Sequence, residues 1–135
     1  MSNNLLSWVA QMTRQKTILI VDDDPSIRHL LEMTVSTEPY NIVVASDGEE
    51  AIELARLHQP DIVLLDVIMP KMDGYEVCEQ LKRDPATEGV VVILLTAKAQ
   101  REDRLRGAAA GADGYIAKPF SPQSLRTSLA QHLSL

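Results

Sequence analysis

The sequence lacks several features that would place it in large classes of proteins. Its 135 residues include a single cysteine, Cys78, so no disulfide can form within the chain. No apolar run approaches the length of a membrane span. The first cation, Arg14, follows the first apolar residues instead of preceding them, unlike the arrangement in a secretion signal. We therefore expect a cytoplasmic protein without a membrane span.

Aromatic side chains are also scarce, at 4% of the chain, whereas hydrophobic residues make up 45%. The core must therefore be aliphatic, and the length is enough for one domain. Residues 1–97 hold 7 basic and 16 acidic side chains, whereas residues 98–135 hold 6 basic and 3 acidic ones. The net charge of −6 argues against direct nucleic-acid binding. The acidic part can hold a cation, and the basic part can meet an acidic partner.

Five apolar segments of strand length alternate with segments of helical periodicity. The apolar segments are continuous, which is typical of a parallel sheet with helices on both faces. Repeated strand–helix–strand units in one domain imply right-handed crossovers. The sequence therefore predicts an α/β fold, a doubly wound (βα)₅ unit of five parallel strands, with strands at residues 17–21, 42–45, 62–65, 90–95 and 115–117.

Capping patterns mark the starts of the predicted helices. In each, a short polar residue can accept a hydrogen bond from the first turn, and a proline or a glutamate follows at the favoured position. The helix predicted at residues 99–110 ends at Gly111, a residue type favoured just after a helix. The starting pairs are Asp24–Pro25, Asp47–Glu50, Asp73–Glu76 and Ser121–Pro122.

Residues 1–16 lie outside this plan and form an N-terminal extension to the domain at 17–135. Apolar residues recur in it at helical spacing, which suits a docking helix or a cap on the domain. A loosely ordered tail is the alternative, because chain termini are often poorly ordered. The residues concerned are Leu5, Leu6, Trp8, Val9 and Met12. We expect no output domain after the last helix.

Polar and charged residues stand at the ends of four of the five predicted strands. Ligands bind beyond the carboxyl ends of the strands in open parallel sheets, so these residues should converge at one edge. The second strand ends without a comparable group. The converging residues are Asp22, Asp23 and Asp24 after the first strand, Asp66 after the third, Thr96 after the fourth and Lys118 after the fifth.

This set predicts a metal site that serves phosphoryl transfer. Neighbouring carboxylates repel one another unless one is protonated or a cation is present, and oxygen ligands favour a hard ion such as Mg²⁺. A carboxylate beside Mg²⁺ can attack a phosphoryl group and form an aspartyl phosphate. Lys118 can then neutralise one phosphoryl oxygen, and Thr96 can donate a hydrogen bond to another.

With these residues in place, the chain resembles the receiver domain of bacterial response regulators. The resemblance covers residues 17–134 and rests on four motifs in order, each at a strand end. They are ILIVDDDP at 18–25, LLDVIMP at 64–70 with MDG at 72–74, TA at 96–97, and YIAKPF at 115–120. It implies the flavodoxin-like strand order 2-1-3-4-5.

The resemblance also implies residue roles. Asp66 is the phosphoacceptor. Asp23 and Asp66 bind Mg²⁺ directly, while Asp22 acts largely through water. The backbone carbonyl of Ile68 is a further ligand. The Lys118–Pro119 bond is expected to be cis, which aims the ammonium inward.

Thr96 and Tyr115 are implied to be a switch pair that carries phosphorylation to a surface. Thr96 moves toward the phosphoryl group and the Tyr115 ring turns inward. This repacks the face made by the fourth helix, the fifth strand and the fifth helix, and thereby changes partner binding. The expected partners are a sensor histidine kinase or a histidine phosphotransfer protein, and an unknown downstream protein. A phosphorylation-dependent dimer stays open, with Asp113 and Arg126 as candidate contacts.

Two other functions compete with this switch. A Mg²⁺-dependent aspartyl-phosphate phosphatase of the haloacid-dehalogenase type would carry a second aspartate two residues after the nucleophile, where this chain has Ile68, which cannot transfer protons. A phosphorylation-independent scaffold would usually lose part of the acidic set. We therefore expect no turnover enzyme. Because Ile68 is bulky and apolar, it should also hinder an attacking water and slow self-dephosphorylation.

Other residues have simpler interpretations. Asp24 and Asp73 are expected to be helix caps, and Cys78 a small buried side chain. The histidines at 29, 58 and 132 lie on predicted helix surfaces without partners at ligand spacing. The arginines at 101, 104 and 106 form either a solvated helix face or a docking patch.

Overall fold

The computed structural model describes residues 15–97 and 100–133. Within them, five parallel strands form one sheet in the order β2-β1-β3-β4-β5, which confirms the predicted fold and strand order. The strands are β1 (Thr17–Val21), β2 (Asn41–Ala45), β3 (Ile62–Asp66), β4 (Val91–Thr96) and β5 (Gly114–Ala117).

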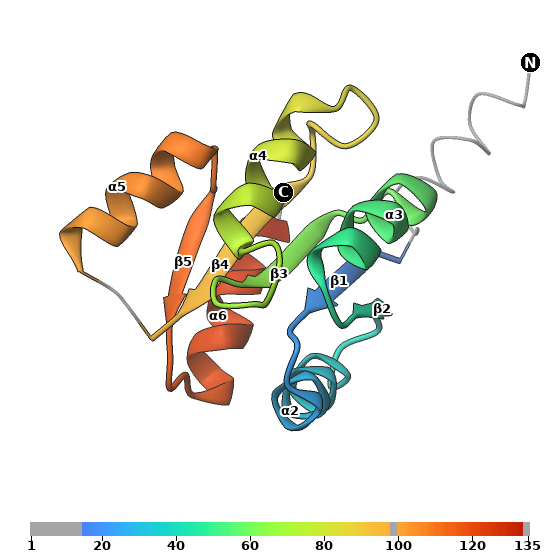
Figure 1. The fold of residues 1–135 in the computed structure, drawn as a ribbon. Coiled ribbons are helices and arrows are strands. Elements are labelled where there is room, and N and C mark those ends of the chain that lie inside the picture. The colour runs from blue at the N-terminus through green and yellow to red at the C-terminus, as the bar shows by residue number, and fades with distance from the viewer. Residues whose placement is uncertain (1–14, 98–99, 134–135) are drawn as a thin grey trace, which may run out of the picture.

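The continuous apolar runs of the strands are explained by two hydrophobic cores, one on each face of the sheet. Successive side chains of a strand point to opposite faces, so Ile18 and Ile20 enter one core while Leu19 and Val21 enter the other. Helices α3, α4 and α5 cover the second of these faces, and α2 and α6 cover the first (Figure 1). Every strand residue of β3 is therefore buried.

Five helices connect or follow the strands in the described part of the chain. They are α2 (Pro25–Val35), α3 (Gly48–His58), α4 (Gly74–Arg83), α5 (Arg101–Ala110) and α6 (Pro122–Leu133). The predicted fourth helix, fifth strand and fifth helix correspond to α5, β5 and α6. None of the helices in the described ranges is long and apolar enough to cross a bilayer.

The predicted helix starts are present, with one difference in detail. Side-chain oxygens of Asp24, Asp47 and Asp73 each accept a hydrogen bond from the first turn of the helix that follows. The Glu50 carboxylate, however, accepts from the backbone N–H of Ser46 at 2.7 Å, one residue before the cap. Gly111 ends α5 with φ of 95°, a conformation that favours glycine.

Some predicted boundaries were wrong by one residue, and one prediction falls outside the described residues. β4 begins at Val91 instead of residue 90 and continues through Thr96, and β3 continues through Asp66. Both polar residues therefore lie within regular strands, which fixes their backbones. The predicted helical pattern between Leu5 and Met12 lies outside the described residues.

Candidate functional site

The predicted polar residues meet at the carboxyl edge of the sheet. Asp66 ends β3 and Thr96 ends β4, while Asp22 and Lys118 directly follow β1 and β5. Because β1, β3, β4 and β5 are consecutive in the sheet, their carboxyl ends are neighbours. β2 ends at Ala45, which has no polar side-chain group to add to the site.

Lys118 connects two buried carboxylates across this edge. Its Nζ donates to Asp66 Oδ1 at 2.9 Å and to Asp22 Oδ2 at 3.3 Å. The Asp22 side chain is 1% exposed and that of Asp66 is 8% exposed. Carboxylate oxygens of Asp22, Asp23 and Asp66 all lie within 4.8 Å of one another. Three acidic side chains and one basic side chain therefore share a small volume.

The backbone around Asp22 is held by its own hydrogen bonds. Asp22 Oδ1 accepts from the N–H of Asp24 at 2.9 Å, and the Asp22 carbonyl accepts from Arg28 Nη1 at 2.9 Å. The second of these contacts comes from the first turns of α2. The end of β1 is thus held in place by contacts with the segment and helix that follow it.

The ionisation of Asp66 and Lys118 reflects this crowding. Burial raises the pKa of Asp66, and the charges of Asp22 and Asp23 raise it further, against the opposing effect of Lys118. For Lys118, burial lowers the pKa, but the hydrogen bond and the charge of Asp66, with those of Asp22, outweigh it and leave the pKa raised. Additional positive charge near Asp66 would therefore stabilise the ionised form of its carboxyl group.

The donor set fits a hard divalent cation. Its side-chain ligands are carboxylate oxygens, two of them buried, and the single ammonium leaves an excess of negative charge. Mg²⁺ favours such oxygen ligands and keeps several waters. Asp22, Asp23 and Asp66 are the residues that could hold it, and a cavity of about 270 Å³ beside them leaves room for waters and a phosphoryl group.

Thr96, Ile68 and Lys118 also line this cavity. Thr96 is buried, whereas the Ile68 side chain is 58% exposed at the rim. The Lys118–Pro119 peptide bond is cis, as predicted. The arrangement offers a nucleophilic carboxylate, a cation site, an ammonium and a hydroxyl around one space, which is a set suited to phosphoryl transfer.

Tyr115, the other half of the predicted switch pair, lies away from the acidic cavity. Its hydroxyl donates to the backbone carbonyl of Asp103 in α5 and lies 3.4 Å from the hydroxyl of Tyr75. The ring packs against Gly107, where a Cβ atom would collide with both the ring and the hydroxyl. Tyr115 therefore fills the space between α5 and α4.

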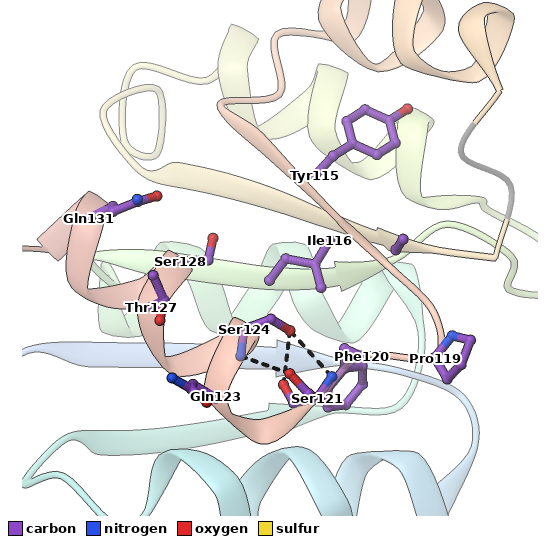
Figure 2. A pocket seen from close by; sticks show the side chains of 11 residues that line it. Tyr115, Ile116, Pro119, Phe120, Ser121, Gln123, Ser124, Thr127, Ser128 and Gln131 are labelled. Atoms are coloured by element: carbon purple, nitrogen blue, oxygen red, sulfur yellow. Dashed lines mark hydrogen bonds between the residues drawn. The ribbon is translucent and has the colours of Figure 1, made fainter.

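A larger cavity of about 800 Å³ lies between β5 and α6, but it offers little chemistry (Figure 2). Its walls are uncharged, with hydroxyl and amide side chains from α6, and Ser121 and Ser124 bond one another across the start of the helix. In Figure 2 the Tyr115 ring points away from α6. We place the site at the smaller cavity because several carboxylates and an ammonium line it, whereas the walls of the larger cavity are uncharged.

Several contacts were not predicted from the sequence. Arg106, expected on a solvated or docking face, lies 3.4 Å from the Asp73 carboxylate and 4.5 Å from the Tyr75 ring centroid. Asp113, a candidate dimer contact, accepts from Lys82 Nζ and from the N–H of Val92, both at 2.8 Å. Their partners are 21 to 33 residues away, so no local pattern indicated them.

Comparison with known proteins supports the resemblance from both sequence and structure. The family model described as the response regulator receiver domain matches residues 18–130. A probable transcriptional regulator ycf27 of Guillardia theta is 47% identical over 117 residues, which are 87% of this chain and 44% of that protein. The alkaline phosphatase synthesis transcriptional regulatory protein PhoP of Bacillus subtilis is 44% identical, over 82% of this chain and 45% of that protein. The chain thus spans about half the length of these curated relatives.

Solved structures agree with the sequence relatives. The chemotaxis protein CheY4 of Vibrio cholerae matches with a TM-score of 0.85 and 32% identity, over 89% of this chain and all of that one. The receiver domain of sensor histidine kinase PA1611 from Pseudomonas aeruginosa matches with a TM-score of 0.83 and 29% identity, over 90% of this chain and all of that one. That structure has a magnesium ion coordinated in its active site cleft.

Proposed function

The chain belongs to the response regulator receiver domain family of two-component signalling, and from that premise we propose that it is a switch operated by phosphorylation of Asp66. The observation that carries the proposal is the buried Asp66 carboxylate, bonded to Lys118 at 2.9 Å with Asp22 and Asp23 beside it. A carboxylate so placed has a counter-charge and an adjoining cavity on the same side.

The proposed transfer is a displacement at phosphorus. A carboxylate oxygen of Asp66 forms a bond to the phosphorus of a phosphohistidine, and the bond from phosphorus to the imidazole nitrogen breaks. The imidazole leaves with the electron pair and takes up a proton. Lys118 and Thr96 contribute by placing a positive charge and a hydroxyl donor at the phosphoryl oxygens, because charge stabilisation dominates such transfers.

Asp23, Asp66 and the backbone carbonyl of Ile68 are the proposed direct Mg²⁺ ligands, and Asp22 would act on the ion largely through water. The bound ion would offset the repulsion between the Asp66 carboxylate and the anionic phosphoryl group. Without a cation the excess negative charge of these residues opposes an incoming anion. Burial, and after it the charges of Asp22 and Asp23, also raises the pKa of Asp66. We therefore expect phosphorylation to require Mg²⁺.

The proposed output is a change in the face formed by α5, β5 and α6, through Thr96 and Tyr115. A sensor histidine kinase or a histidine phosphotransfer protein would supply the phosphoryl group, and an unknown protein would bind the changed face.

We propose that residues 17–135 form the receiver domain, with 1–16 as an extension. DNA binding is named for RpaA of Synechocystis, a protein of which this chain covers 45%; for the acidic domain itself we propose protein contacts only.

Incubation with Mg²⁺ and a small acyl phosphate tests the acceptor. Intact-protein mass spectrometry should show the addition of one phosphoryl group to the wild type and none to Asp66→Asn. Asp47→Asn is the matched control, because Asn also caps a helix and Asp47 lies at α3, outside the cavity. An unmodified wild type, or a modified Asp66→Asn, would contradict the proposal.

We further propose a switch and not a turnover phosphatase. Ile68 stands where a phosphatase of the alternative type would need its proton-transferring aspartate, and its exposed side chain lies at the rim of the cavity. It can shield the aspartyl phosphate from water. Ile68→Asn should therefore shorten the phosphoryl half-life; an unchanged or longer half-life would contradict the shielding, and multiple turnover on a phosphomonoester would favour the phosphatase.

A further inference from the structure

The start of α4 packs directly on the backbone of the proposed phosphoacceptor. The N–H of Gly74 donates to the Val67 carbonyl at 2.8 Å. A Cβ atom at residue 74 would collide with the carbonyl oxygen of Asp66 and with Val67, so no side chain can separate the two segments. A displacement of the backbone at Asp66 therefore displaces the first residues of α4 as well.

Asp73, the cap of α4, also reaches α5. One of its carboxylate oxygens accepts from the N–H of Glu76 at 2.9 Å, and the other lies 3.4 Å from Arg106 Nη2. The Arg106 guanidinium carbon is 4.5 Å from the centroid of the Tyr75 ring. Arg106 of α5 thus contacts two groups at the start of α4, the Asp73 carboxylate and the face of the Tyr75 ring. Both groups attract a cation.

Tyr75 extends the same set of contacts to the middle of the α4–α5 interface. Its side chain is buried, and its hydroxyl lies 3.4 Å from both the Tyr115 hydroxyl and the Asp103 carbonyl. The ring therefore has Arg106 on one side and the Tyr115 hydroxyl near its tip. These contacts run from the backbone of Asp66 to α5 without passing through Thr96.

We propose that Arg106 and Tyr75 are positioning residues that tie α5 to the phosphoacceptor loop, and so give Asp66 a second connection to the output face. The inference rests on the proposed function of Asp66. The Arg106–Asp73 ion pair is partly exposed, with side chains 61% and 29% accessible, so breaking it costs little free energy. The pair nevertheless holds α5, a helix that buries only Gly107 and Ala110. Weak contacts can determine the position of a helix with so little apolar burial.

Reciprocity of coupling gives the direction of the expected effect. If the tie holds α5 in its unphosphorylated position, then phosphorylation must strain it, and its removal must favour the phosphorylated state by the same amount. Arg106→Gln should therefore tighten the binding of beryllofluoride with Mg²⁺ by about three- to tenfold. Without beryllofluoride and Mg²⁺, the NMR resonances of the α5 backbone amides in Arg106→Gln should move toward their positions in the beryllofluoride-bound wild type.

Matched variants separate the tie from a general charge effect. Arg101→Gln removes the same charge from an exposed position of the same helix and should leave the affinity and the α5 resonances unchanged. Asp73→Asn retains a capping oxygen and should act in the same direction as Arg106→Gln, but by less, because Arg106 keeps its contact with the Tyr75 ring. The double variant Asp73→Asn with Arg106→Gln should show no further gain, while Arg106→Lys, which keeps the charge without the planar group, should be intermediate.

The outcomes distinguish the tie from the switch itself. Additive effects of Asp73→Asn and Arg106→Gln, or an effect of Arg101→Gln as large as that of Arg106→Gln, would overturn the proposed tie. Unshifted α5 resonances in Arg106→Gln without ligand would overturn it as well. A wild type that fails to bind beryllofluoride with Mg²⁺ would contradict the function proposed for Asp66, whereas the ligand-free resonances would still report on the tie.

Discussion

The helices α4 and α5 have equal lengths and lie on the same face of the sheet, yet they are held in different ways. Each has 10 residues. α4 buries the side chains of Tyr75, Val77, Cys78 and Leu81, and its start is capped by Asp73. α5 buries only Gly107 and Ala110, and its Gln100 cap makes no side-chain hydrogen bond. One helix is fixed by apolar burial and the other by a few directional contacts.

This difference indicates where the molecule can change at little cost. Moving a helix that buries large side chains opens cavities, each of which costs several kcal/mol. Moving a helix held by hydrogen bonds and an exposed ion pair costs about 1 kcal/mol per contact. A phosphoryl group can supply the smaller amount more readily. The loosely packed α5, and not α4, is therefore the element suited to carry a signal from the acidic cavity.

The largest expected effect comes from truncating a leucine in each helix. Leu81 in α4 is fully buried, whereas Leu105 in α5 is 58% exposed. Leu81→Ala should lower the free energy of unfolding by about 2–5 kcal/mol. Leu105→Ala, the matched control, should change it by no more than about 0.5 kcal/mol. Urea unfolding measures both, and similar losses at the two positions would remove the distinction between the helices.

The next effect concerns the close approach of Tyr115 to α5. Alanine suits a helix interior better than glycine by about 1 kcal/mol. At residue 107, however, the new Cβ would collide with the Tyr115 ring, and such overpacking costs about 1–3 kcal/mol. Gly107→Ala should therefore destabilise the wild type and stabilise the Tyr115→Ala variant in thermal or urea unfolding. A loss of the same size in both backgrounds would show that the ring is not the obstacle.

The sequence predicted the acidic cavity well because its residues are placed by topology. Parallel strands bring their carboxyl ends to one edge, so Asp22, Asp66, Thr96 and Lys118 had to meet once the strands were assigned. The helix caps were equally predictable, since each depends on residues within four positions. These are features in which the local sequence decides the local structure.

The α4–α5 interface could not be predicted in the same way. Arg106 looked like part of an exposed arginine cluster, and nothing near it in the sequence indicates Asp73 or Tyr75, 33 and 31 positions away. The position of Tyr115 depends on the absence of a side chain at Gly107 across the interface. Such contacts follow from how two helices pack on a sheet, which periodicity alone does not determine.

A third prediction concerns the pH dependence of stability that arises from the Cys78 thiol, which forms a hydrogen bond between the two helices. Cys78 of α4 donates to the Ala110 carbonyl of α5 at 3.4 Å, and burial raises the pKa of the thiol from 9.0 to about 11. The folded protein therefore holds this proton more tightly than the unfolded chain does. Its contribution to stability is complete below about pH 9 and is lost as the pH rises from about 9 to about 11.

Between pH 8.5 and 10.5 the wild type should consequently lose about 1–2 kcal/mol more free energy of unfolding than Cys78→Ala does. Both proteins carry the same lysines and tyrosines, so the difference between them isolates the thiol. Urea titrations under reducing conditions at the two pH values measure it. Equal losses in the two proteins would mean that the thiol ionises as freely in the folded protein as in the unfolded chain.

The smallest effect tests whether the Tyr115 hydroxyl fastens α5 without affecting α4. Tyr115→Phe keeps the ring against Gly107 but removes the hydrogen bond to the Asp103 carbonyl, which should cost about 0.5–1.5 kcal/mol. Because the bond lies at the first turns of α5, hydrogen exchange of the Arg104 amide should quicken while that of Val77 in α4 stays unchanged.

Tyr75→Phe is the control, and its effect should be smaller because both of its hydroxyl contacts are 3.4 Å long. Equal quickening in the two helices would mean that α4 and α5 open together, which would contradict the difference in stability between them.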